Sequence, residues 1–182
     1  MNATNLQYTH KYNPMGPAGY LLTFRTYGTW LHGDERGSTD RKGHNIPGTP
    51  VISPDQALVE MEKRKLKQPP VTFTISQRKS VDQTIHEVCA HNKWILHAVN
   101  PRTQHVHAVI TALKSPESVM NSLKSWCTRK MRENRLWNNE HSPWSRHGST
   151  RYLWNEKDIH DAGVYVLYRQ EENHRPNGRG TA

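Results

Sequence analysis

The sequence predicts an α+β fold of the ferredoxin-like type, with the order βαββαβ, one antiparallel sheet, helices on one face and a further C-terminal helix. Two observations support this prediction. Short runs rich in β-favouring residues alternate with longer runs whose apolar residues recur at helical spacing. Their order along the chain suits an antiparallel sheet covered by helices. The length of 182 residues fits one domain, or one domain with a long insertion.

The first expected strand runs from Gly19 to Tyr27, a segment rich in aromatic and β-favouring residues. Residues 28–50 then carry many glycines, prolines and charged residues, which indicates a loop. We therefore interpret residues 1–18 as an N-terminal extension, residues 19–170 as a single domain, and residues 28–70 as an insertion within that domain.

Two helices and a short strand are expected next. Asp55 is predicted to cap a helix that extends to Gln68 and stops before Pro69. The segment from Val71 to Ile75 is a candidate strand. Ser80 and Gln83 form a capping-box pattern, and the apolar residues behind them predict a helix from Ser80 to Asn92.

A hairpin and a basic helix are predicted in the middle of the chain. The runs Trp94 to Val99 and His105 to Ala112 are expected to be strands, joined by a short polar connection. Ser115 then caps a helix with Pro116 at its first position. This helix is expected to reach Arg135.

The last expected elements are a strand from Thr150 to Trp154 and a helix from Asn155 to Gln170. Residues 171–182 are polar and contain proline and glycine, so they are predicted to be a disordered tail.

Composition favours a polyanionic partner. The formal net charge is +9, with 12 histidines not counted, which is typical of proteins that bind nucleic acid. Trp137, Trp144 and Trp154 lie among basic residues, so they are either stacking platforms for bases or core tryptophans beside solvated arginines. Arg36 and Arg41 extend the basic set. The residues expected to contact DNA are Arg25, Lys124, Arg129, Lys130, Arg132, Arg146 and Arg151.

Two features bear on the environment of the protein. Cys89 and Cys127 fall in apolar stripes without metal-binding spacing, so we expect two buried, reduced thiols. The sequence contains no long apolar run, which predicts a cytoplasmic protein without a membrane span.

A histidine pair is the first candidate for chemistry. His105 and His107 are two residues apart on a predicted strand, so both imidazoles point to the same face. Val106 and Ala108 point the other way, into the expected core. Two such imidazoles can share a divalent cation, but a third ligand must come from elsewhere. The alternative is a pair of polar rings on the solvent side of the sheet.

Two tyrosines on the last helix are the second candidate. Tyr165 borders a stripe formed by Ile159, Ala162 and Val166, and Tyr168 follows within one turn. A phenol oxygen that attacks a phosphodiester forms a covalent phosphotyrosine, which retains the bond energy for later rejoining. The alternative is ordinary packing, with the hydroxyl at the surface.

Taken in order, these motifs resemble a known family. HVHAVI, from His105 to Ile110, resembles the metal-binding strand of HUH nucleases, which has a hydrophobic residue between two histidines. A helix tyrosine about sixty residues later, followed by a glutamine, resembles the single-tyrosine transposases of the IS200/IS605-like group and the REP-associated tyrosine transposases. Residues 23–38 are also similar to the start of some bacterial members.

The resemblance implies an enzyme that depends on Mg²⁺ or Mn²⁺. It would nick and rejoin single-stranded DNA at hairpin-bearing ends through a 5′-phosphotyrosine link. His105 and His107 would be metal ligands, Tyr165 the nucleophile and Gln170 the third ligand. The family often places that ligand four residues after the tyrosine, where this chain has Arg169.

Several alternatives stay open at the level of sequence. Tyr168 with Glu172 has the more usual spacing of nucleophile and ligand. Members of the family are often homodimers, so a dimer is one expectation. A decayed transposase that binds structured single-stranded nucleic acid without cutting it would also account for the charge, and a small metal-dependent hydrolase that uses water is a third reading.

Overall fold

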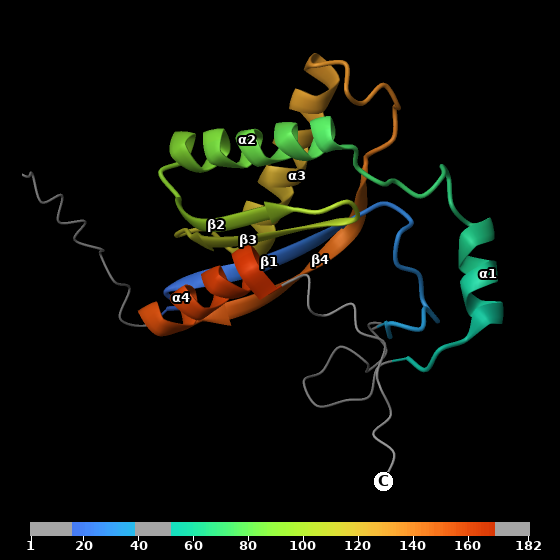
Figure 1. Cartoon of the computed structure of the whole chain (residues 1–182), viewed down its shortest axis with the longest axis horizontal. Helices are drawn as coiled ribbons and strands as arrows, with labels where there is room; N and C mark the ends of the chain where they lie inside the picture. Colours follow the sequence, from blue (N-terminus) through green and yellow to red (C-terminus); the bar gives the residue numbers. More distant parts are fainter. Residues whose placement is uncertain (1–15, 39–51, 170–182) are drawn as a thin grey trace, which may run out of the picture.

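The structure is a computed structural model (Figure 1) that describes residues 16–38 and 52–169. Four strands form one sheet in the order β2-β3-β1-β4, and each neighbouring pair is antiparallel. The strands are β1 (Gly19–Thr26), β2 (Ile95–Pro101), β3 (His105–Thr111) and β4 (Trp144–Leu153). With the helices between them, this is the ferredoxin-like arrangement, so the predicted fold class is confirmed.

Helices cover both faces of the sheet. They are α1 (Gln56–Arg64), α2 (Ile75–His91), α3 (Pro116–Glu133) and α4 (Glu156–Val164), and α4 continues into a π-helical turn, η1 (Tyr165–Arg169). Figure 1 shows α2 and α3 together on one face, α4 on the other and α1 apart from the sheet. The two helices of the βαββαβ unit thus share one face as predicted, and the C-terminal helix occupies the face that the histidines were expected to share.

Strand alternation divides the interior into two clusters. On the face toward α2 and α3, Leu22, Phe24 and Val106 are fully buried within the larger cluster. On the face toward α4, Val109 and Val166 are fully buried within a much smaller one. Since buried apolar area drives folding at roughly 25 cal/mol per Å², the α2/α3 face supplies most of the stability.

Helix α2 begins earlier than predicted. Thr74 is its N-cap, and Thr74 and Gln77 form the capping box that was assigned to Ser80 and Gln83. Ser80 is instead a buried residue in the second turn of the helix. The apolar stripe is weak before Val81, because Ile75 is 65% exposed, so periodicity alone did not reveal this turn.

The strand predicted over Val71 to Ile75 is absent from the structure. The backbone N–H of Val71 donates to Tyr27, and that of Phe73 donates to Thr103. These single bonds reach two different segments, so no continuous ladder forms. Their side chains are buried, which explains the strand-like pattern of this segment.

Strand β4 begins at Trp144, six residues before the predicted start. The Trp144 indole is buried edge-on against the rings of Phe24 and Phe73, each at 5.1 Å between centroids. Polar residues fill most of the strand between Trp144 and Leu153 because its middle is exposed at the edge of the sheet. The usual alternation is therefore missing from the sequence.

Other local predictions are confirmed. Asp55 and Ser115 cap α1 and α3, although α1 ends at Arg64 rather than at Gln68. Asn155, the predicted start of the last helix, is the N-cap of α4. Cys89 and Cys127 are free and buried, and burial raises the pKa of both thiols. Among the described residues, no helix combines the length and the apolar character that crossing a membrane requires.

Candidate active site

The two histidines of β3 lie side by side on the face that α4 covers. Both rings are partly buried, and their centroids are 4.7 Å apart at an interplanar angle of 79°. Val106, between them, is fully buried on the opposite face. Strand alternation therefore presents both imidazoles to one side, as the sequence predicted.

Thr23 orients one of these rings. It lies directly opposite His107 in the β1–β3 ladder, and its Oγ1 is 2.8 Å from Nδ1 of His107, within hydrogen-bond distance. When Nδ1 carries the proton, it donates to Thr23 and leaves the Nε2 lone pair available to a ligand. The strand pairing thus supplies the kind of second hydrogen bond that accompanies a metal-binding histidine.

The charge state of His107 suits the same role. Burial lowers the pKa of His107 to about 3, with further contributions from His105, Arg25 and Arg102. The ring is therefore neutral at physiological pH, which is the form that binds cations. Arg102, in the β2–β3 hairpin, was not among the residues singled out from the sequence.

Tyr165 lies next to this pair. Its ring centroid is 6.0 Å from that of His107, and the two rings meet edge to face at 83°. Asn100 lies opposite His107 on β2, and its Nδ2 donates to the carbonyl of Val166 at 2.8 Å. This bond ties the end of α4 to the sheet beside Tyr165, so the residue that follows the tyrosine is anchored to the strand next to the histidines.

Tyr165 also marks a change in the helix. It is the C-cap residue of α4 and the first residue of η1, a π-helical turn. Isolated π turns often occur at functional sites. Because Tyr165 is partly buried against the sheet, the transition occurs directly over the histidine-bearing strand.

Tyr168 points elsewhere. It is 75% exposed and lines a cavity of about 610 Å³ together with His97 and His160. The structure thus brings Tyr165, and not Tyr168, into ring contact with the histidine pair. Gln170 and Glu172, the two suggested third ligands, lie outside the described residues.

The donor set fits a divalent cation in part. His105 and His107 offer two adjacent imidazoles, one of them held by Thr23. Within residues 16–38 and 52–169, no group of three histidine, cysteine or acidic side chains is arranged to hold a metal ion. A complete site therefore needs a ligand beyond these residue types or beyond this part of the chain.

Arg25 and Lys124, both expected to contact DNA, occupy very different positions. Arg25 lies opposite His105 in the β1–β3 ladder, on the face of the sheet that carries the histidines. Burial and the neighbouring charge of Arg36 lower its pKa to about 10, so the guanidinium stays protonated at neutral pH. Lys124 is buried, and its Nζ donates to the carbonyls of Ser145 and His147, so the structure gives it a role in holding β4.

The other predicted DNA contacts fall into two groups. Arg129, Lys130 and Arg132 belong to α3, which covers the opposite face of the sheet from the histidines. Arg146 and Arg151 are exposed on the edge strand β4. Arg41 lies outside the described residues. The predicted contacts therefore lie on several sides of the fold, and among those that the structure describes Arg25 is the one next to the histidine pair.

The three tryptophans considered as stacking platforms differ in burial. Trp144 is a core residue, and its Nε1 donates to the carbonyl of Lys124. Trp137 packs against the core cluster. Trp154 is 58% exposed and stacks on Tyr152, with ring centroids 6.2 Å apart. Of the three, Trp154 alone presents an aromatic face suited to a nucleobase.

Residues 66–157, just over half of the chain, match the family described as "Transposase IS200 like". The chain belongs to this transposase family. The matching residues include the histidine pair and end before Tyr165, so the match does not reach the tyrosine.

A solved structure described as "Structure of the REP associates tyrosine transposase bound to a REP hairpin" is similar to this transposase-family chain, with 11% identity and a TM-score of 0.47. The similarity covers 88% of this chain and 70% of that one. No curated protein matches the sequence.

Some residues that contact the histidines and the tyrosine helix of this transposase-family protein were not predicted from the sequence. Thr23 and Asn100 come from different strands and reach His107 and Tyr165 only through the sheet register. Since register is set by tertiary pairing, their sequence positions carry no signal of this role. Trp30 lies in the predicted loop of residues 28–50, and its ring packs against the guanidinium groups of Arg25 and Arg36. The only sequence signal of this contact is a large aromatic residue in a segment otherwise rich in glycines and charges.

Proposed function

We propose that the protein is a metal-dependent enzyme that cleaves single-stranded DNA and rejoins its ends through a 5′-phosphotyrosine intermediate. The observation that supports this best is the convergence of His105, His107 and Tyr165 from two elements far apart in sequence. Family membership supports the same reaction class. Hairpin-bearing DNA is the proposed substrate, on the strength of the resemblance described above.

In this mechanism, the phenolic oxygen of Tyr165 attacks the phosphorus of one phosphodiester. The P–O3′ bond breaks, the departing strand takes a proton as its 3′-hydroxyl, and Tyr165, having lost its phenolic proton, carries the 5′-phosphate. Rejoining is the reverse attack by a 3′-hydroxyl, which returns the proton to the tyrosine. The bond energy is conserved, so no nucleotide cofactor is required.

His105 and His107 are the proposed ligands of Mg²⁺ or Mn²⁺. A bound divalent cation would polarise the scissile phosphate and stabilise the charge that develops on its oxygens. Within the chain, Thr23 orients His107, and Asn100 anchors the backbone beside Tyr165. These contacts hold the proposed ligand and the proposed nucleophile on one side of the sheet.

Gln170 is the proposed third ligand. In an α-helix a residue five positions after Tyr165 lies off its face, whereas hydrogen bonds in a π-helical turn join residues five apart. Gln170 follows Tyr165 by five residues, and η1 begins at Tyr165. The π turn is therefore compatible with Tyr165 and Gln170 acting together, and Gln170 itself lies outside the described residues.

Two further expectations belong to this proposal. Exposed Arg146 and Arg151 on the edge strand and the stacked pair of Tyr152 and Trp154 are suited to contacts with DNA outside the cleavage site. A homodimer remains a prediction, and so does the cytoplasmic location.

Covalent capture tests the function without knowledge of the target sequence. The full chain would be incubated with Mn²⁺ and a library of labelled single-stranded hairpins with randomised flanks, denatured in detergent, and analysed for DNA that migrates with the protein. We expect an adduct that EDTA prevents. Tyr165→Phe should abolish it, whereas Tyr168→Phe, a matched change three residues away on an exposed side chain, should leave it intact.

The outcomes separate the readings. An adduct that survives Tyr165→Phe and disappears in Tyr168→Phe would reassign the nucleophile. Hairpin binding without any adduct across the library would favour a non-cleaving nucleic-acid-binding protein. Release of cut DNA with no covalent intermediate in wild type would indicate hydrolysis by water.

A further inference from the structure

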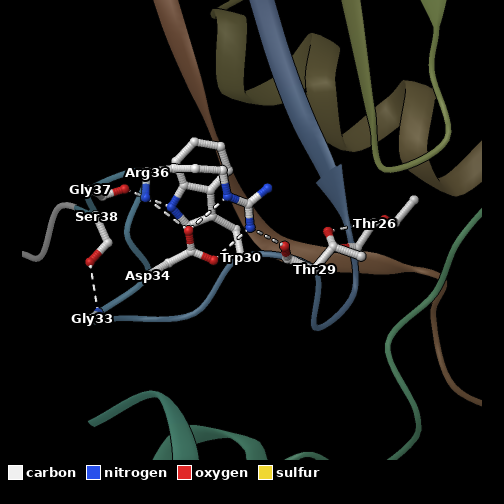
Figure 2. Close-up of polar contacts among 8 residues, drawn as sticks. All are labelled: Thr26, Thr29, Trp30, Gly33, Asp34, Arg36, Gly37 and Ser38. Atoms are coloured by element: carbon white, nitrogen blue, oxygen red, sulfur yellow. Dashed lines mark hydrogen bonds and ion pairs between the residues drawn. The ribbon is translucent and has the colours of Figure 1, made fainter. Parts of the chain in front are cut away.

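The loop that follows β1 is built around one tryptophan. Trp30 donates its Nε1–H to the carbonyl of Gly37 at 2.7 Å, and the guanidinium carbons of Arg25 and Arg36 lie over its ring at 3.4 and 4.3 Å. Figure 2 shows the indole beside the Arg36–Asp34 pair. Cations over an indole face are attracted by its quadrupole, so Trp30 holds both arginines.

Several hydrogen bonds within the loop hold its conformation. Arg36 makes two bonds to Asp34, from Nε at 2.7 Å and Nη2 at 2.6 Å, and Nη2 also donates to the carbonyl of Thr29. Gly33 adopts φ +85° and its N–H donates to Ser38 (Figure 2). A β-carbon there would lie 2.5 Å from the carbonyl oxygen of Asp55, so glycine is required. The indole therefore sits on a closed, hydrogen-bonded scaffold.

The two arginines over this ring differ in one respect. The charge of Arg36 is balanced by Asp34. Among the described residues, no carboxylate forms an ion pair with Arg25, although its side chain is half-buried. Asp34 also attracts Arg25 electrostatically, so the two arginines share one carboxylate. A half-buried guanidinium that shares its counter-charge in this way is stabilised when an anion binds beside it.

The position of Arg25 identifies the anion. Arg25 and His105 are direct neighbours across the β1–β3 ladder, so their side chains leave the same face within reach of each other. Thr23, two residues earlier on β1, contacts His107 on that same face. A DNA strand cut by Tyr165 would pass this point with its phosphates, and a guanidinium binds phosphate through paired charge-assisted bonds.

We propose that Arg25 binds the DNA phosphate at or next to the cleaved bond, and that Trp30 is a positioning residue that holds the Arg25 guanidinium toward the histidine pair. This inference rests on the proposed function for the identity of its ligand. It assigns a role to the first part of the insertion, residues 28–38, as the scaffold of a phosphate-binding arginine. Arg36 completes that scaffold through its ion pair with Asp34.

The test measures how DNA affinity depends on salt. The full chain in EDTA would be titrated with a fluorescein-labelled oligothymidine of about 12 nucleotides, followed by anisotropy between about 50 and 200 mM NaCl. Each lost phosphate contact reduces the slope of log K against log salt by about 0.7 for a single strand. For Arg25→Gln we expect this reduction in slope, together with an affinity for the oligothymidine that is about tenfold weaker at the lowest salt. Lys79→Gln, which removes an exposed charge from α2 on the opposite face, should change neither quantity.

Trp30 variants separate positioning from a structural role. Trp30→Leu removes no charge, yet it should reduce the salt slope as Arg25→Gln does, while Trp30→Phe, which keeps an aromatic face, should restore most of it. Thermal unfolding of each variant identifies any that fails to fold. For a folded Trp30→Leu, an unchanged slope would remove the positioning role.

An adduct assay on a captured hairpin separates this inference from the proposed function. Arg25→Gln should slow adduct formation at least about tenfold, whereas Tyr165→Phe abolishes it. If wild type forms no adduct, the proposed function fails, and the salt slope alone decides whether Arg25 binds phosphate. If Arg25→Gln keeps both the wild-type slope and the wild-type adduct rate, the inference is overturned and the function stands.

Discussion

The two faces of the sheet are made from alternate residues of the same strands, yet they serve different ends. Toward α2 and α3, Leu22 and Phe24 are fully buried in the larger apolar cluster. Toward α4, the neighbouring residues Thr23 and Arg25 lie opposite His107 and His105. One face supplies most of the folding free energy, whereas the other carries polar groups whose burial costs free energy. Such an arrangement is typical of a functional site. Adjacent residues on β1 should therefore behave in opposite ways when substituted.

The largest effect is expected from the core face. Phe24→Ala leaves a cavity among Trp144, Val106 and their neighbours and should lower the free energy of unfolding by about 3–5 kcal/mol. Urea denaturation followed by tryptophan fluorescence measures this. Leu113→Ala, at a side chain that is 95% exposed, is the control and should stay within about 0.5 kcal/mol of wild type. A small effect at Phe24 would mean that the two faces contribute alike.

Thr23, the residue just before Phe24 on the same strand, should give the reverse result. Thr23→Val keeps the shape of the side chain and removes its hydrogen bond to His107. We expect Mn²⁺ affinity, measured by calorimetry, to fall about 10- to 100-fold, with a smaller loss of stability than in Phe24→Ala. Thr103→Val, in the exposed hairpin turn, is the control. Unaltered Mn²⁺ binding in Thr23→Val would count against a metal site at His107.

Lys124 tests a charged group on the core face. Burial lowers the pKa of Lys124 to about 8, while an unfolded lysine keeps a value of about 10.4. Between these values the unfolded state binds more protons, so the free energy of unfolding should rise with pH. Relative to Lys124→Met, wild type should gain about 2 kcal/mol from pH 7.5 to 10, by urea denaturation at each pH. Parallel profiles for the two proteins would contradict a buried, strained charge at this position.

The smallest effect is expected from Asn100, a polar residue whose role is to hold the end of α4 on the sheet. Asn100→Ala removes the bond to the carbonyl of Val166 and should cost about 1 kcal/mol. The loss should be local, as faster amide hydrogen exchange in α4 and η1 with little change in α2. Asn92→Ala, which removes a similar side-chain bond to the carbonyl of Val88, should leave exchange in α4 unchanged. Equal acceleration in both helices would show that Asn100 does not anchor the tyrosine specifically.

Much of the secondary structure could be predicted because its signals are local. Asp55 and Ser115 identify helix starts by their capping chemistry, and the pattern from His105 to Ile110 identifies a strand with two faces. The errors arose where burial was decided by distant partners. Val71 and Phe73 are buried without being in a ladder, and Trp144 begins a strand because aromatic rings from two other segments enclose it.

By itself, the sequence determined that His105 and His107 share a face, because period two is a property of any strand. It also placed Tyr165 on a helix, since the apolar spacing of Ile159, Ala162 and Val166 is a local feature. Which tyrosine meets the histidines was decided by tertiary structure, through the packing of α4 on the sheet and the bond from Asn100 to Val166. The same holds for Thr23 and Arg25, because strand register depends on the partner strand and no residue encodes it alone.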